Sequence, residues 1–104
     1  MNSIIEQNKN KIFKICKEFH VEKLYTIGSV NNDNFNEESD VDLIVSFNMK
    51  NLSLEEYADN YFGMQSKLEE VLDKEVDLIT ERSIKNPYFL QEVLNTRVLL
   101  FQSN

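Results

Sequence analysis

The stretch LYTIGSVNNDNFNEESDVDLIVSF, residues 24–47, contains two apolar runs separated by a polar segment. The first run, residues 24–27, is rich in apolar and β-branched side chains and ends at Gly28. In the second run, residues 41–47, Val and Leu at alternate positions are followed by Phe47. These patterns predict two β-strands, which we expect to be antiparallel neighbours.

Asp40 and Asp42 are separated by one residue at the start of the second predicted strand. Side chains alternate between the two faces of a strand, so both carboxylates project from the same face, roughly 7 Å apart. Two such charges repel each other unless one takes up a proton or a cation lies between them, and a hard divalent cation is the commoner solution at neutral pH. Taken alone, Asp-x-Asp is more often a polar strand edge, so the hypothesis of a metal site depends on the neighbouring motif.

That neighbouring motif is Gly28-Ser29, at the end of the first predicted strand. In an antiparallel pair, the end of the first strand lies beside the start of the second, where Asp40 and Asp42 are found. Glycine has no Cβ, so an anion can approach the peptide N–H groups there, and the Ser29 hydroxyl supplies a further donor. Gly-Ser alone indicates only a turn, but together with Asp-x-Asp it predicts a phosphate site beside a metal site.

The remaining sequence predicts further elements around these two strands. We expect helices over residues 3–19, 54–72 and 87–94, a third strand over residues 76–80, and a final edge strand or helix end over residues 97–101. Asp77 and Ile79 share one face of the third strand, so Asp77 can join the first two acids. The order of elements predicts an α+β (α/β) fold, a small mixed β-sheet flanked by helices, in a single domain over residues 1–104.

Gly-Ser, ten intervening residues and Asp-x-Asp resemble the signature of the nucleotidyltransferase superfamily that includes DNA polymerase beta. The match is best to its minimal members, the MNT proteins, and runs from Leu24 to the C-terminus. Members of this family carry a third carboxylate on a later strand, which Asp77 matches here. The resemblance departs from the family at residues 30–33, which read Val-Asn-Asn-Asp where the family commonly has an Arg-x-Arg-Gly type sequence.

The resemblance implies the nucleotidyltransferase fold and a metal-dependent transfer of NMP, with AMP from ATP as the expected case. Asp40, Asp42 and Asp77 would be the catalytic residues and would ligate one or two Mg²⁺ ions, while Gly28 and Ser29 would bind the nucleotide. Minimal members often have a HEPN-domain toxin as partner and attach AMP to one of its tyrosines, which gives them an antitoxin role. The same role is implied for this chain.

Composition excludes several other classes of function. The chain has 18 Asp and Glu against 11 Lys and Arg, a net charge of −7, so we expect no nucleic-acid partner. No apolar run is long enough to span a membrane, and the N-terminus lacks a signal-peptide pattern, so we expect a cytoplasmic protein without a membrane partner. The single cysteine, Cys16, is expected to be a small core residue.

Two functional hypotheses from different classes remain at this point. The first is an active nucleotidyltransferase, favoured because Gly28-Ser29 and all three acids are present. The alternative is a non-catalytic antitoxin that neutralises its partner by contact, favoured by the absence of arginines after Gly28-Ser29. Binding and turnover of ATP with Mg²⁺ would distinguish them.

Overall fold

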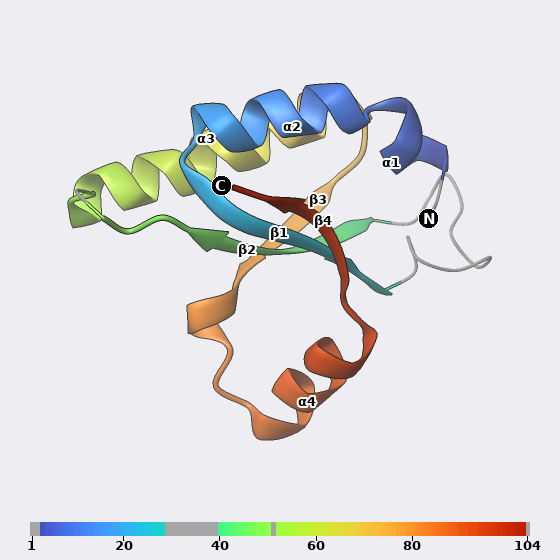
Figure 1. Ribbon diagram of the computed structural model, residues 1–104, viewed down its shortest axis with the longest axis vertical. Helices are drawn as coiled ribbons and strands as arrows, with labels where there is room; N and C mark the ends of the chain where they lie inside the picture. Colours follow the sequence, from blue (N-terminus) through green and yellow to red (C-terminus); the bar gives the residue numbers. More distant parts are fainter. Residues whose placement is uncertain (1–2, 29–39, 51, 104) are drawn as a thin grey trace.

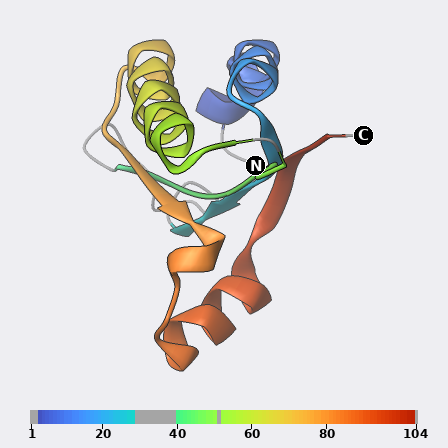
Figure 2. The ribbon, with the colours of Figure 1, turned by 90° about the vertical axis from the view of Figure 1, so that its left-hand side faces the viewer.

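The computed structural model describes residues 3–28, 40–50 and 52–103. Its elements, in chain order, are α1 (Ser3–Gln7), α2 (Lys9–Glu18), β1 (Val21–Ile27), β2 (Val41–Phe47), α3 (Leu54–Leu72), β3 (Val76–Thr80), the short 3₁₀ helix η2 (Glu81–Ser83), α4 (Pro87–Thr96) and β4 (Val98–Gln102). The helices α2 and α3 cover one face of the sheet, and α4 lies on the other face (Figures 1 and 2). The expected fold, a small mixed sheet flanked by helices, is confirmed.

The four strands lie side by side in the order β3-β2-β1-β4. As expected, β1 and β2 are antiparallel. Of the two alternatives predicted for residues 97–101, an edge strand or a helix end, the structure has the edge strand: β4 pairs antiparallel with β1. After β2 the chain runs back along one face of the sheet as the crossover helix α3 and then forms β3, which is parallel to β2. This topology places the end of β1 and the beginnings of β2 and β3 at the same end of the sheet.

Apolar side chains form a cluster on each face of the sheet. The larger cluster, on the α2 and α3 side, joins Val41, Leu43 and Val45 of β2 to buried residues of both helices. The smaller cluster, on the α4 side, joins Ile44 of β2 to Val93 of α4 and to residues of β1. The alternation along β2 therefore assigns odd-numbered residues to the main core and even-numbered residues to the α4 face.

The long helix α3 and the short helix α4 each begin at a side-chain cap. Ser53 Oγ accepts a hydrogen bond from the Glu56 N–H at 3.1 Å, and Glu56 accepts from the Ser53 N–H, which completes a capping box. Asn86 Oδ1 accepts from the N–H groups of Tyr88 and Phe89 at the start of α4. These caps determine the first residue of α3, the helix that follows β2, and of α4, the helix that precedes β4.

The N-terminal region differs from the single helix expected over residues 3–19. It forms two helices, because the chain breaks at Asn8, whose side-chain Nδ2 donates to the Ile4 carbonyl at 2.8 Å. Asn competes with the backbone for hydrogen bonds in this way and so interrupts helices. The first strand also begins earlier than expected, at Val21.

Gly63 in α3 lies against the ring of Phe19, just after α2. A Cβ at this position would lie 2.7 Å from Phe19 Cε1, so the glycine allows the two helices to approach closely. We expect Gly63→Ala to lower the free energy of unfolding by about 1 kcal/mol, because overpacking costs roughly 1–3 kcal/mol and the gain in helix propensity offsets about 1 kcal/mol. Urea denaturation would measure this change. Ser66→Ala, at an exposed position of the same helix, is the control, and equal stability of both variants would contradict the packing role of Gly63.

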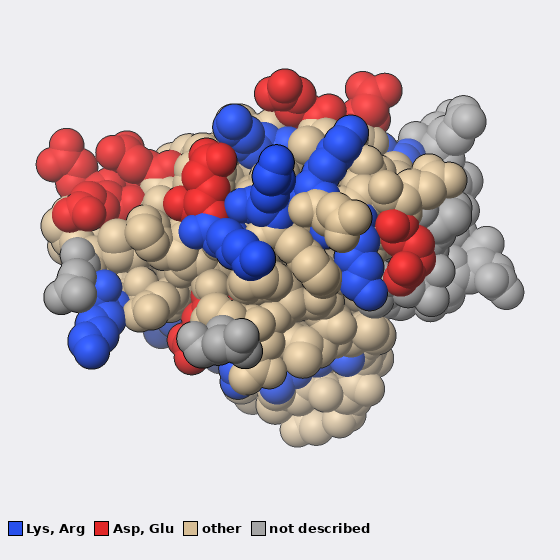
Figure 3. All heavy atoms as spheres, turned by 45° about the horizontal axis from the view of Figure 1, so that its top comes forward, with Lys and Arg blue, Asp and Glu red and all other residues tan. Residues whose placement is uncertain are grey.

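The helix layer carries charges of both signs. Four lysines lie within α2, at positions 9, 11, 14 and 17, and two glutamates lie in the first turn of α3. Figure 3 looks onto this layer and shows basic side chains over its middle and acidic side chains at its left end, where α3 begins. Within α2, Cys16 is buried, and burial raises the pKa of its thiol to about 12. None of the described helices is both long and apolar enough to cross a membrane.

Candidate active site

Asp42 and Asp77 lie side by side on adjacent strands. They are partners in the parallel register of β2 and β3, where neighbouring strands are about 4.8 Å apart. The residues that flank them, such as Leu43 and Leu78, belong to the main core, so both carboxylates project from the opposite, α4 face. Asp40, just before β2, is exposed, as is Asp77, whereas Asp42 is half-buried. The structure thus places Asp42 and Asp77, two of the three acids that the sequence singled out, next to each other.

The three acids also interact electrostatically. The pKa of Asp42 is raised above its ordinary value, first by burial, then by the negative charge of Asp77, and then by that of Asp40. Each of these effects disfavours the ionised form of Asp42. A proton or a cation near the three carboxylates would relieve the repulsion.

The described residues contain no group of three His, Cys, Asp or Glu side chains that could hold a metal ion as they stand. A metal cluster of Asp40, Asp42 and Asp77 therefore stays a prediction.

Gly28 touches the site from β1. Its φ is +75°, a left-handed conformation suited to glycine, and it follows Ile27, the partner of Asp42 in the antiparallel register. A Cβ on Gly28 would lie 2.7 Å from Asp42 Oδ2. The glycine therefore makes room for the Asp42 carboxylate, a role that the sequence did not reveal. Ser29 lies outside the described residues, and the expected phosphate contacts of Gly28 and Ser29 stay a prediction.

Tyr61 of α3 reaches the same strand as Asp77. Its hydroxyl donates a hydrogen bond to the Leu78 carbonyl. The pKa of Tyr61 is raised by burial, then by the charge of Asp77, and then by Tyr57. Sequence reasoning missed this contact, because helical periodicity shows which face of a helix is buried but not which backbone group a hydroxyl reaches.

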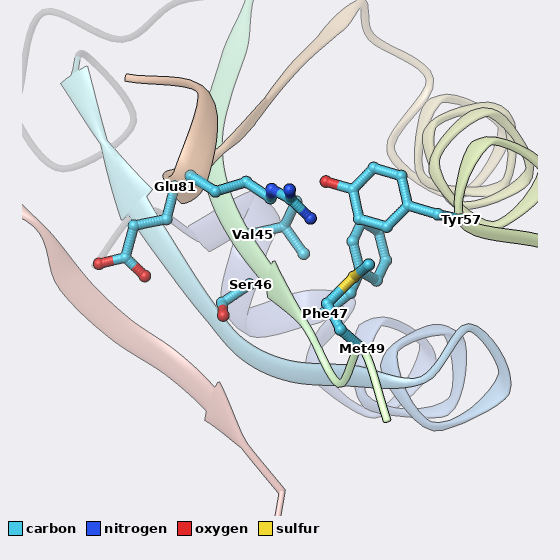
Figure 4. Close-up of a pocket in the computed structure, with 7 residues that line it drawn as sticks. Val45, Ser46, Phe47, Met49, Tyr57 and Glu81 are labelled. Carbon is cyan, nitrogen blue, oxygen red and sulfur yellow. The ribbon is translucent and has the colours of Figure 1, made fainter. Parts of the chain in front are cut away.

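An open pocket of about 310 Å³ lies away from the acids, toward the other end of β2. Its walls come from β2, the segment after it, α3 and η2, and comprise Val45, Ser46, Phe47, Met49, Tyr57, Glu81 and Arg82 (Figure 4). Phe47 and Tyr57 make an edge-to-face contact, and the Arg82 guanidinium lies 5.6 Å from the Tyr57 ring centre. Val45 is three residues beyond Asp42, about 10 Å along the strand, so this pocket and the acidic site are separate.

The raised pKa of Asp42 has a consequence for stability in metal-free solution. The folded state holds the Asp42 proton more tightly than the unfolded state, so this group's contribution to stability is fully present below its unfolded pKa and is lost as the pH rises through its folded pKa. The amide introduced by Asp42→Asn does not titrate. We expect this variant to gain stability relative to the wild type as the pH rises from about 3 to about 7.

Urea midpoints of the two proteins, measured across this range with a chelator present, would test that expectation. The repulsion between Asp42 and its neighbours would be contradicted if the difference between the two urea midpoints stayed constant with pH. It would also be contradicted if the wild type became the more stable of the two as the pH rises.

Comparison with curated proteins finds a similar archaeal protein. The protein named "Putative protein adenylyltransferase MJ1379", from Methanocaldococcus jannaschii, is 36% identical over 93 residues. The match covers 88% of this chain and 89% of the archaeal protein. The two chains are thus similar over nearly their full lengths.

Two solved structures share the fold. A crystal structure of a toxin-antitoxin with AMP-PNP superposes with a TM-score of 0.70 at 26% identity, over 92% of this chain and 74% of that chain. A complex of a tri-AMPylated Shewanella oneidensis HEPN toxin with an MNT antitoxin has a TM-score of 0.64 at 25% identity, over 94% of this chain and 72% of that chain. The expected resemblance to minimal nucleotidyltransferases is confirmed.

The family model of the nucleotidyltransferase domain matches residues 9–100. This range begins at α2 and ends within β4, so it includes all of β1, β2 and β3, part of β4, and the acids Asp40, Asp42 and Asp77. The enzyme class expected from the sequence is therefore confirmed, and the chain belongs to the nucleotidyltransferase domain family.

Proposed function

We propose that this chain transfers AMP from ATP to a tyrosine hydroxyl of a HEPN-type toxin partner in the cytoplasm, and so acts as an antitoxin. The observation that carries the proposal is the placement of Asp42 and Asp77 as direct neighbours on one face of β2 and β3, with Asp40 close enough to raise the pKa of Asp42. Membership of the nucleotidyltransferase family supplies the reaction class.

The choice of nucleotide and acceptor is supported by the similar proteins. One relative is named a protein adenylyltransferase, one similar structure contains the ATP analogue AMP-PNP, and another pairs an MNT antitoxin with an AMPylated HEPN toxin. All three similar proteins point to an adenine nucleotide. The structure with AMP-PNP and the complex with the AMPylated toxin also point to a toxin-antitoxin context. Transfer of AMP to a protein is the activity that these observations have in common.

The donor set at the site fits a hard divalent cation. Carboxylate oxygens are the ligands that Mg²⁺ prefers, and burial together with two neighbouring charges raises the pKa of Asp42, as expected where negative charge is not yet neutralised. We assign Asp40, Asp42 and Asp77 as ligands of one or two Mg²⁺ ions. When bound, Mg²⁺ would neutralise charge on the triphosphate and lower the pKa of the attacking hydroxyl.

The residues of the chain would act around the α-phosphorus of ATP. The oxygen of the acceptor hydroxyl forms a bond to this phosphorus, and the bond from the phosphorus to the oxygen bridging the α- and β-phosphates breaks, which releases pyrophosphate. The Asp77 carboxylate would take the hydroxyl proton. Gly28 and Ser29 would orient the β- and γ-phosphates through backbone N–H groups and the Ser29 hydroxyl.

The proposal is tested by incubating the purified chain with α-labelled ATP, Mg²⁺ and a purified HEPN-type partner. We expect label on the partner, a mass increase equal to one or more AMP groups, and modification of tyrosine in a peptide map. An Asp40→Asn, Asp42→Asn double variant is the inactive control. Label transfer that is equal in wild type and double variant, or no transfer by a wild type that binds the partner, would overturn the proposal.

The contact-only alternative is supported by one sequence feature, since residues 29–39 contain neither Lys nor Arg. Arginine binds phosphate oxygens well, so its absence favours weak nucleotide binding. The same double variant distinguishes the two cases in a growth assay with the toxin. A transferase loses neutralisation when the acids are removed, whereas a contact-only antitoxin retains it.

A further inference from the structure

β3 is an edge strand, with β2 on one side only. The Val41 N–H donates to the Glu75 carbonyl at 3.0 Å, so Glu75 directs its carbonyl toward β2. Backbone N–H and C=O groups point to alternate sides of a strand from one residue to the next. The backbone groups of Asp77 therefore also point toward β2, whereas the backbone groups of Val76 and Leu78 point toward the open edge. Unpaired groups at such an edge are the sites at which a further strand could add.

Three side chains of α3 bond to these outward-directed groups. Gln65 Nε2 donates to the Val76 carbonyl at 3.0 Å, and the Val76 N–H donates to Glu69 Oε2 at 3.0 Å. The Tyr61 hydroxyl donates to the Leu78 carbonyl. Tyr61, Gln65 and Glu69 are spaced four residues apart, so they share one side of the helix. We call these three residues the α3 edge ladder, and Figure 2 shows α3 running above the sheet edge formed by β3.

The α3 edge ladder bonds the residues on both sides of Asp77. β2 fixes the backbone of Asp77 from one side, and the ladder fixes Val76 and Leu78 from the other. The direction of a Cα–Cβ bond depends on the orientation of the backbone around it, so these contacts determine where the Asp77 carboxylate projects. Asp42 needs no such support, because β2 is an inner strand with partners on both sides.

We propose that Tyr61, Gln65 and Glu69 are positioning residues that hold Asp77 beside Asp42 for cation binding. This inference rests on the proposed function, because it takes Asp77 as a ligand of the catalytic cation. A merely structural ladder would change the stability of the fold but leave the cation affinity of the folded protein unchanged. The cation affinity of the folded variants therefore distinguishes a positioning role from a merely structural one.

The test compares variants that remove one ladder bond with a variant that keeps it. Glu69→Leu removes the acceptor for the Val76 N–H, whereas Glu69→Gln keeps an oxygen acceptor at the same position. Gln65→Met removes the donor at similar length, and Tyr61→Phe removes only the hydroxyl. The probe is Mn²⁺, titrated in the presence of AMP-PNP and followed by electron paramagnetic resonance, with circular dichroism to verify folding and amide hydrogen exchange at Val76 as a second readout.

We expect Glu69→Leu and Gln65→Met to raise the Mn²⁺ dissociation constant about tenfold, the lower end of the range for residues that orient metal ligands. Hydrogen exchange at the Val76 amide should become faster in Glu69→Leu. Glu69→Gln should keep both the wild-type Mn²⁺ dissociation constant and the wild-type exchange rate at Val76. If Glu69→Leu fails to fold, Gln65→Met and Tyr61→Phe carry the test.

The outcomes separate this inference from the proposed function. The positioning role alone would be overturned by the following result: the wild type binds Mn²⁺, Asp77→Asn does not, and every folded ladder variant binds Mn²⁺ with the wild-type affinity. Wild type that does not bind Mn²⁺ with nucleotide would overturn the proposed cation site and the positioning role with it. A loss of affinity in Glu69→Leu that Glu69→Gln reverses supports the inference.

Discussion

Asp42→Asn should lower AMP transfer to the toxin partner about a thousandfold or more. Asp42 is the direct neighbour of Asp77 on the adjacent strand, and burial and the charges of Asp77 and Asp40 raise its pKa, so Asp42 interacts with both other acids of the proposed cation site. Loss of a carboxylate that helps to hold a catalytic cation removes several kcal/mol of transition-state stabilisation, and ~4 kcal/mol corresponds to a thousandfold. Initial rates of label transfer at saturating ATP and Mg²⁺ would measure the effect.

Asp59→Asn is the matched control for this change. Asp59 is an exposed acid on α3, in the helix layer on the other side of the sheet, so the same chemical substitution there should leave the rate unchanged. An Asp42→Asn variant that retained the wild-type rate would exclude Asp42 from the reaction.

Gly28→Ala should lower the transfer rate about a hundredfold and the free energy of unfolding by about 1 kcal/mol. The methyl group would lie 2.7 Å from Asp42 Oδ2, so the carboxylate has to move, and the backbone φ of +75° is strained for alanine. Displacement of a reacting group by about 1 Å can cost about a hundredfold in rate. Kinetics of label transfer and urea denaturation of the same variant measure the two effects.

The other glycine of the chain provides the control, because Gly63→Ala perturbs packing against Phe19 and not the acids. Gly63→Ala should lose stability while each folded molecule keeps its transfer rate. If Gly28→Ala lost stability but kept its rate, the contact between Gly28 and the Asp42 carboxylate would have no part in the reaction.

The parts of the fold that follow from local patterns could be predicted from the sequence. Alternation of apolar residues determines β2 and its two faces, and the same alternation in β3 places Asp77 on the face of Asp42. The start of α3 follows from its capping box, and the start of α4 from Asn86 and Pro87. Each of these signals depends only on residues close together in the chain.

Other features depend on residues brought together by the fold, and the sequence alone does not reveal them. The close approach of Gly28 to Asp42 requires the register of β1 on β2, and the α3 edge ladder requires the distance from α3 to the edge of β3. The break at Asn8 depends on a choice between two competing sets of hydrogen bonds. The sequence also predicts a loop, or a short helical turn followed by a loop, over residues 31–39, in which Phe35 either anchors the loop to the core or flanks a nucleotide base. These residues lie outside the described part of the structure, so this stays a prediction.

The proposed function requires that Asp40, Asp42 and Asp77 form one cation site that serves the nucleotide. A crystal structure of this chain with Mg²⁺ and AMP-PNP would show whether they do. We expect carboxylate oxygens of Asp40 and Asp42 about 2.1 Å from Mg²⁺, an oxygen of Asp77 directed at the same site, and the triphosphate beside Gly28. Nucleotide and Mg²⁺ bound in the pocket between Phe47 and Tyr57, with the three acids directed to solvent, would refute the shared cation site.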